Sequence, residues 1–360
     1  MMTLTLDDNP LSFPLVEHLL YTPSLVHAVQ SVSAGQKGFF GATAVQTCLR
    51  ERGLAIRALR IELRDHELIK PASLLSVFLL GISSSWTEEK PICYGKEHLS
   101  GARTLLAKAL MDEKKKDDPV IQYILGWYLY WDMTCAFVAE PDDYDASPMN
   151  EVEVVTAIER SRTSFHPMIG FSAKLFYNLA SVGRHCRRVL ATGVGDADLE
   201  TMLEIELLSW NLDHGDKTLI DMSFAYRNHG LIMLYEIYGR RHQPEVNVYS
   251  TMGKEHDLSC VIRLLAMESL KRLLDTPIDA ACINFHSMPL LTAGAQLRHD
   301  DTRMRVRVVD RFKDLYSTNR IMVNIWAIEL LEELWVLRDG GEVISWPELL
   351  LSKDWTLNFA

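Results

Sequence analysis

The stretch that decides the fold runs from Pro91 to Val138 and reads PICYGKEHLSGARTLLAKAL, MDEKKKDD and PVIQYILGWYLYWDMTCAFV. Its first part places apolar residues three and four positions apart, the spacing of one face of an α-helix. Its last part follows Asp118 and Pro119, which are typical of a helix start, and is almost wholly apolar. A helix without a polar face is buried. The stretch therefore predicts two antiparallel helices, the second of them central to the core.

The rest of the chain keeps this helical spacing. Strand-like alternation and repeats of fixed period are absent from the sequence. Two segments have irregular composition, the acidic segment from Ala139 to Pro167 and the segment from His242 to Glu255, and we expect both to be loops. The fold class predicted is all-α, a single irregular domain of residues 1–360 with about a dozen helices packed as antiparallel pairs.

Composition excludes several classes of function. A hydrophobic content of 48% is ample for a large core, and a net charge of −11 disfavours nucleic-acid binding by this chain alone, because phosphates attract clustered Lys and Arg. The sequence has no signal peptide and no apolar run of about eighteen residues, so we expect a soluble intracellular protein that does not enter a membrane.

The chain has six cysteines, the number that a binuclear zinc cluster uses, but their spacing argues against such a cluster. Each lies more than twenty residues from the next, whereas zinc modules hold pairs of cysteines close together in sequence. Asp142, Asp143 and Asp145 suggest a metal loop, yet the downstream ligands of a calcium site are missing. We therefore expect neither a metal nor a cofactor.

Several segments resemble one family. EHLSGARTLL (Glu97–Leu106), WYLYWDMTCAF (Trp127–Phe137) and LLEELW (Leu330–Trp335) are similar to helices of the fungal-specific transcription factor domain. Weaker matches continue in the correct order from about Asn9 to Trp346. The resemblance implies the all-helical regulatory region that lies downstream of a zinc-cluster DNA-binding module, here without that module, and it implies a nuclear location.

The candidate site residues are polar or aromatic side chains on apolar helices. Asp132 follows an aromatic cluster, and Tyr226 and His229 share one helical face. For each, a structural role in the core is the alternative to a role in a pocket. Helical bundles build ligand pockets between facing helices. We expect an apolar cavity between the helix of the aromatic cluster and helices of the carboxyl-terminal half, and the predicted ligand-binding residues are Trp127, Trp131, Asp132, Tyr226, His229 and Trp326.

Two functions fit these observations, and no known catalytic motif decides between them. The first is a regulatory domain that senses a small lipophilic molecule or a partner protein, with homodimerisation also open. The alternative is a family member repurposed as a cytoplasmic cyclase or isomerase, acting on a pathway intermediate of fungal secondary metabolism. In the enzyme, Asp132 and His229 would be the catalytic residues, and the aromatic side chains would stabilise a cation. Whether the chain is complete or a portion of a longer regulator stays open.

Overall fold

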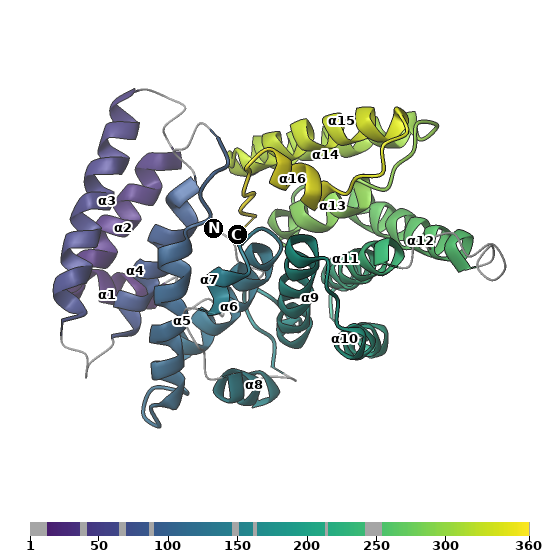
Figure 1. Ribbon diagram of the computed structural model, residues 1–360. Coiled ribbons are helices and arrows are strands. Elements are labelled where there is room, and N and C mark those ends of the chain that lie inside the picture. The colour runs from purple at the N-terminus through teal and green to yellow at the C-terminus, as the bar shows by residue number, and fades with distance from the viewer. Residues whose placement is uncertain are drawn as a thin grey trace. The chain divides into compact units, whose positions relative to one another are not determined.

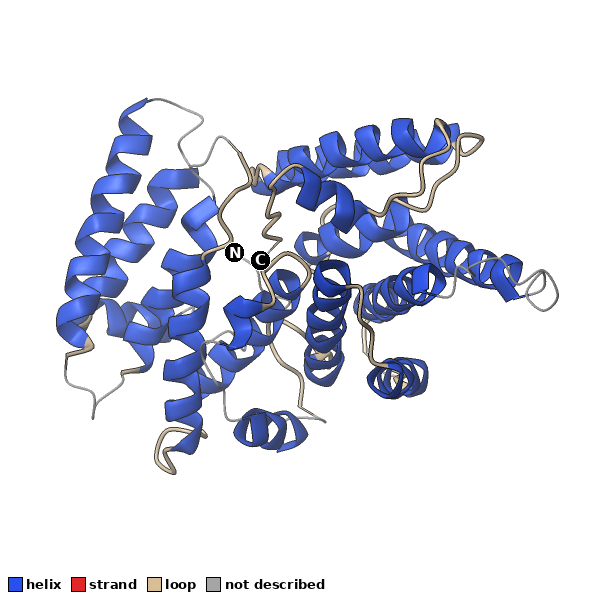
Figure 2. Cartoon of the chain, viewed as in Figure 1, coloured by secondary structure: helices blue, strands red, loops and turns tan. Residues whose placement is uncertain are grey.

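The computed structural model describes residues 13–36, 42–64, 70–85, 90–145, 151–160, 164–212, 215–241 and 254–359. Within these ranges the regular structure is helical and contains no β-strand, as Figure 2 shows; the one strand-like pairing is an isolated bridge between His166 and Gly170. The predicted all-α class is confirmed. The described helices run from α1 to α16, more than the dozen predicted, because the chain also forms short helices such as α7 and α16.

The described helices fall into two compact units. The first comprises Met1–Asp132 and Asp142–Lys174, and the second comprises Met133–Pro141 and Leu175–Phe359. Folding as a single domain and packing as antiparallel pairs stay predictions.

The first unit is built from helices of the amino-terminal half (Figure 1). Helix α2 packs on α3 and α4, α4 packs on α5, and α5 contacts α8. The bounds are α1 Phe13–Tyr21, α2 Pro23–Gln36, α3 Ala42–Glu62, α4 Pro71–Ile82, α5 Lys96–Met111, α6 Pro119–Ala136, α7 Asp142–Asp145 and α8 Glu151–Arg160.

The second unit is organised around the short helix α13, whose eight residues are all buried. Helices α11, α12, α14 and α15 contact it, and α10 packs on α11. The bounds are α9 Ala173–Thr192, α10 Ala197–Ser209, α11 Lys217–Arg241, α12 Lys254–Asp275, α13 Ser287–Gly294, α14 Thr302–Asn319, α15 Val323–Asp339 and α16 Trp346–Ser352.

Helix α6 begins where the sequence predicted. The backbone N–H of Val120 donates to Asp118 Oδ1 at 2.8 Å, which makes Asp118 the cap of this helix. Trp131 is fully buried, and its ring centroid lies 5.4 Å from that of Phe78 on α4. A Cβ atom on Gly81 would collide with the Trp131 ring, so only glycine permits this close approach. The buried position predicted for this helix is confirmed.

One expected loop is wrong. The acidic segment from Ala139 to Pro167 contains helices α7 and α8, and α8 turns Val154, Ala157 and Ile158 inward. These three residues follow the helical spacing of an amphipathic helix, a signal that the acidic and proline residues around it obscured. The second expected loop, from His242 to Glu255, lies mostly outside the described residues.

We predict that Trp131→Ala lowers the free energy of unfolding by about 3–5 kcal/mol, because truncating a buried aromatic residue leaves a cavity. Urea denaturation followed by circular dichroism measures this change. Tyr21, which is 78% exposed, provides the control, and Tyr21→Ala should change stability by less than about 0.5 kcal/mol. A loss below about 1 kcal/mol at Trp131 would show that the residue does not fill the core.

Candidate functional site

The six residues predicted to bind a ligand are all buried, and the two units divide them into two groups. Trp127, Trp131 and Asp132 lie on α6 in the first unit. Tyr226 and His229 on α11 and Trp326 on α15 lie in the second unit. A common cavity lined by all six stays a prediction.

Asp132 forms a buried ion pair. Arg103 Nη2 donates to Asp132 Oδ1 at 3.2 Å, and the two side chains are 11% and 7% exposed. Arg103 Nε also donates to the Tyr128 hydroxyl at 3.1 Å. These bonds join α5 to α6 and balance the charge of the carboxylate. They support the structural role that was the alternative to a pocket acid.

We predict that Asp132→Asn destabilises the protein by about 3 kcal/mol, because it leaves the Arg103 charge buried without a counter-ion. Chemical denaturation measures the loss. The double variant Arg103→Met with Asp132→Leu removes both charges and should cost less than the single change. A single variant as stable as the wild type would argue against a structural ion pair.

Tyr226 and His229 make hydrogen bonds inside the second unit. The Tyr226 hydroxyl donates to the Phe285 carbonyl at 2.8 Å, and His229 Nδ1 lies 2.8 Å from the Thr292 hydroxyl. The His229 ring is also 4.6 Å from the ring of Phe137. Burial lowers the pKa of His229 to about 3, so the imidazole is neutral at physiological pH. Its Nε2 atom is buried without a partner.

The neutral His229 predicts a pH dependence of stability. Its pKa is about 3 in the folded chain and about 6.5 in the unfolded chain, so the unfolded state takes up a proton first as pH falls. Its contribution is fully present above about pH 6.5 and declines at lower pH, by up to about 1.4 kcal/mol per pH unit. We predict that His229→Asn flattens the slope of unfolding free energy between about pH 6.5 and 4.5, above the range in which most carboxylates titrate.

Urea denaturation at several pH values measures this slope. His286 serves as an internal reference, because burial also lowers its pKa to about 3 and the His229→Asn variant keeps it. An unchanged slope in the variant would mean that His229 does not titrate on unfolding.

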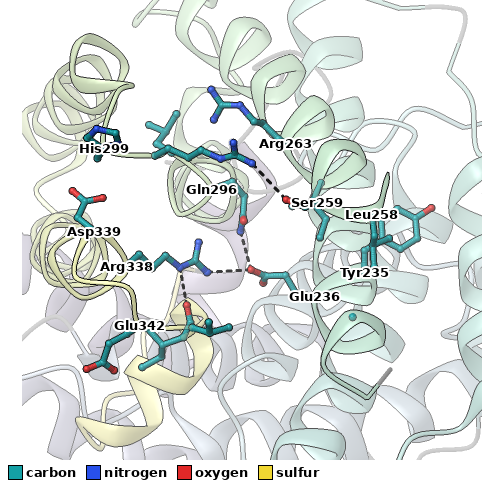
Figure 3. A pocket seen from close by; sticks show the side chains of 16 residues that line it. Tyr235, Glu236, Leu258, Ser259, Arg263, Gln296, His299, Arg338, Asp339 and Glu342 are labelled. Atoms are coloured by element: carbon teal, nitrogen blue, oxygen red, sulfur yellow. Dashed lines mark hydrogen bonds and ion pairs between the residues drawn. The ribbon is translucent and has the colours of Figure 1, made fainter. Parts of the chain in front are cut away.

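A pocket of about 660 Å³ lies in the second unit, and none of the six predicted residues lines it. Its walls come from α11, α12, the segment after α13, and the end of α15 with the loop that follows it (Figure 3). The polar lining residues include Glu236, Arg263, Gln296, Arg298, His299 and Arg338, and the apolar ones include Leu258, Ile262, Leu297, Val343 and Ile344. This volume is typical of sites for small molecules.

Glu236 lies at the centre of the polar lining. Gln296 Nε2 and Arg338 Nη2 donate to its Oε1 atom at 3.0 and 3.3 Å, and Figure 3 shows the three side chains pointing toward one another. Arg338 is fixed further by bonds to the carbonyls of Ala295 and Ile344, at 2.5 and 2.7 Å. The second oxygen of Glu236, Oε2, is buried and has no hydrogen-bond partner. The pocket lining therefore contains an unsatisfied acceptor.

The cations of the lining differ in how they are neutralised. Arg263 holds Asp301 through two bonds of 2.8 and 2.9 Å, and these bonds lower the pKa of Asp301 to about 2. Arg298 is exposed, and no carboxylate of the described chain lies within ion-pair distance of it. Its Nη2 atom makes one long contact, 3.5 Å to Ser259 Oγ. The pocket lining therefore includes an exposed guanidinium with no carboxylate of the described residues within ion-pair distance.

The described ranges contain no group of three or more His, Cys, Asp and Glu side chains placed to hold a metal ion. No helix in these ranges is both long enough and apolar enough to cross a membrane.

The fold and the pocket describe an all-α domain with a small-molecule-sized site. Among protein families, the fungal specific transcription factor domain matches residues 1–360, the whole chain. The chain belongs to this family, as the sequence resemblance predicted. Searches among curated proteins and among solved structures found no match. Family membership supports a role in the regulation of transcription and points to the nucleus.

Sequence reasoning missed the pocket residues. Glu236 had a usable signal, because it interrupts the apolar run LIMLYEIYG on α11 in the way that Asp132 interrupts its own helix. Gln296 and Arg338 had no such signal in the sequence. Gln296 follows α13 and Arg338 lies in the last turn of α15, and neither interrupts an apolar run. Their approach to Glu236 depends on the packing of α11, α13 and α15.

Proposed function

We propose that this domain regulates transcription in response to a small, largely apolar molecule bound in the pocket of the second unit. The observation that carries the proposal is the Oε2 atom of Glu236, an acceptor without a partner in the pocket lining. A buried polar atom without a hydrogen bond is costly, and a ligand that donates to it removes this cost. Carboxylate torsions are soft, so a small rotation of Glu236 directs the oxygen to the ligand.

The position of Glu236 supports a regulatory response. Its carboxylate joins α11 to Gln296, which follows α13, and to Arg338 on α15. A ligand that binds this packing arrangement more tightly than alternative arrangements increases the fraction of molecules that adopt it. A change in how these three elements pack then alters the surface that the domain presents to the transcription machinery.

A lipophilic ligand was predicted from the sequence, and the apolar walls of the pocket support one. The proposed location differs, because Glu236 and Arg338 replace the aromatic cluster of α6 as the centre of the site. Sensing of a partner protein or a second copy is less well supported, since the unsatisfied acceptor lies in a pocket and is buried. The cyclase or isomerase alternative stays a prediction. Asp132 is paired with Arg103, and His229 is bonded to Thr292.

A transcription reporter tests the proposal. The full chain is fused to an unrelated DNA-binding module, and reporter cells are supplied with dodecanol, an apolar chain with one hydroxyl. We predict that the fusion alters reporter transcription, that dodecanol changes its output, and that Glu236→Gln removes the dodecanol response. The matched control is Glu329→Gln, which removes the same charge from an exposed position on α15 outside the pocket.

Two results would contradict the proposal. A fusion that leaves transcription at the level of the DNA-binding module alone would argue against a regulatory domain. An equal dodecanol response in wild type and Glu236→Gln would argue against sensing in this pocket. The level of each fusion protein, measured by immunoblot, separates a lost response from a lost protein.

A further inference from the structure

We infer that the ligand is a hydroxylated carboxylic acid, with its hydroxyl at Glu236, an apolar body along the pocket wall and its carboxylate at Arg298. This inference rests on the proposed function and specifies the ligand of the same pocket. It follows from the placement of one unsatisfied acceptor, Glu236 Oε2, and one exposed cation, Arg298, in a lining whose other arginines, Arg263 and Arg338, are paired with carboxylates of the chain.

The inner contact calls for a neutral donor. Arg338 already balances the charge of Glu236, and both side chains are largely buried, with exposures of 23% and 11%. An ammonium group there would add a second cation beside Arg338 and leave a net buried charge, which is unfavourable. A hydroxyl donates a hydrogen bond to Oε2 and leaves the charge balance unchanged.

Part of the pocket lining is apolar. Leu258 and Ile262 come from α12, and Val343 and Ile344 come from the loop after α15. Polar groups of a ligand would lose water here without gaining partners, whereas hydrocarbon gains about 25 cal/mol for each Å² that it buries. The body of the ligand that joins its two polar ends is therefore hydrocarbon.

The outer contact calls for an anion of a single charge. Arg263 is paired with Asp301 and Asp339 with Arg305, and no carboxylate of the described residues lies within ion-pair distance of the exposed Arg298 guanidinium. At longer range the charge of Arg298 helps to lower the pKa of Asp301. The Glu342 carboxylate is turned away from Glu236 (Figure 3). A guanidinium pairs with a carboxylate through two parallel hydrogen bonds. A phosphate monoester would bring a charge near −2 against this one free cation.

Calorimetric titration of the purified full chain tests the inference with three probes of one chain length: ω-hydroxydodecanoate, dodecanoate and dodecanol. The hydroxy acid should bind most tightly, because it alone makes both polar contacts. Arg298→Gln should weaken binding of the two acids about tenfold, equal to about 1.4 kcal/mol, and leave dodecanol unchanged. Glu236→Gln should weaken the hydroxy acid and dodecanol and leave dodecanoate unchanged.

The control is Arg303→Gln, which removes the same charge from an exposed residue of α14 that does not line the pocket, and which should leave all three affinities unchanged. Because Arg298 is exposed, its substitution is not expected to affect folding, and thermal melting checks this. The Arg298 comparison therefore remains decisive even where Glu236→Gln lowers stability.

Three results would overturn the inference. Equal affinity for dodecanol and the hydroxy acid would show that the carboxylate makes no favourable contact. An unchanged affinity of Arg298→Gln for the two acids would show that Arg298 does not bind it. The proposed function would survive either result if the dodecanol response in cells still required Glu236. If none of the three probes binds, the ligand is not of this class. The sensing function is tested separately by the reporter, and an absent response to dodecanol would contradict it.

Discussion

Helices without a polar face impose the constraint on which the rest of this structure depends. Helix α13 has eight buried residues, so it requires cover on all sides, and α11, α12, α14 and α15 supply it. Helix α6 has the same property in its apolar and aromatic sequence, and α4 approaches it closely enough that Gly81 has no room for a side chain beside Trp131. Helix α4 is itself nearly wholly buried, whereas an amphipathic helix such as α14 buries one face.

Covering such helices also buries polar groups, and three examples in this chain have different outcomes. Asp132 is paired with Arg103, so its charge is balanced. His229 is kept neutral by burial, which lowers its pKa to about 3, and one of its nitrogens is bonded to Thr292. Glu236 is half satisfied, with one oxygen bonded to Gln296 and Arg338 and the other free beside a pocket. His229 Nε2 and Glu236 Oε2 are both buried without a partner, but of the two residues only Glu236 lines the pocket.

A half-satisfied carboxylate at the meeting of three elements suits a regulatory domain. A structural ion pair gains nothing from a ligand, because its partners are already in place. The free oxygen of Glu236 is satisfied only when a donor arrives, and the same carboxylate holds α11 to Gln296 and Arg338. Under the proposed function, ligand binding and helix packing would share this one group, which would couple them energetically.

The sequence by itself determined the helical class, the family, the start of α6 at Asp118 and the burial of this helix. These properties depend on neighbours within about one helical turn, where periodicity and capping residues are readable. The helix α8 was readable in the same way from Val154, Ala157 and Ile158, and the acidic residues around it led to the wrong prediction of a loop. Family resemblance extended this local information along the chain.

The tertiary structure alone decided which polar residues are partners. Arg103 and Asp132 are 29 positions apart, and Glu236 and Arg338 are 102 positions apart. No local pattern relates residues at such separations, because their distance depends on how several helices pack. Asp132 and Glu236 look alike in sequence, because each is an acid within a locally apolar run of its helix. Packing gave Asp132 a full partner and left Glu236 one free oxygen in a pocket, and this difference places the candidate site in the second unit.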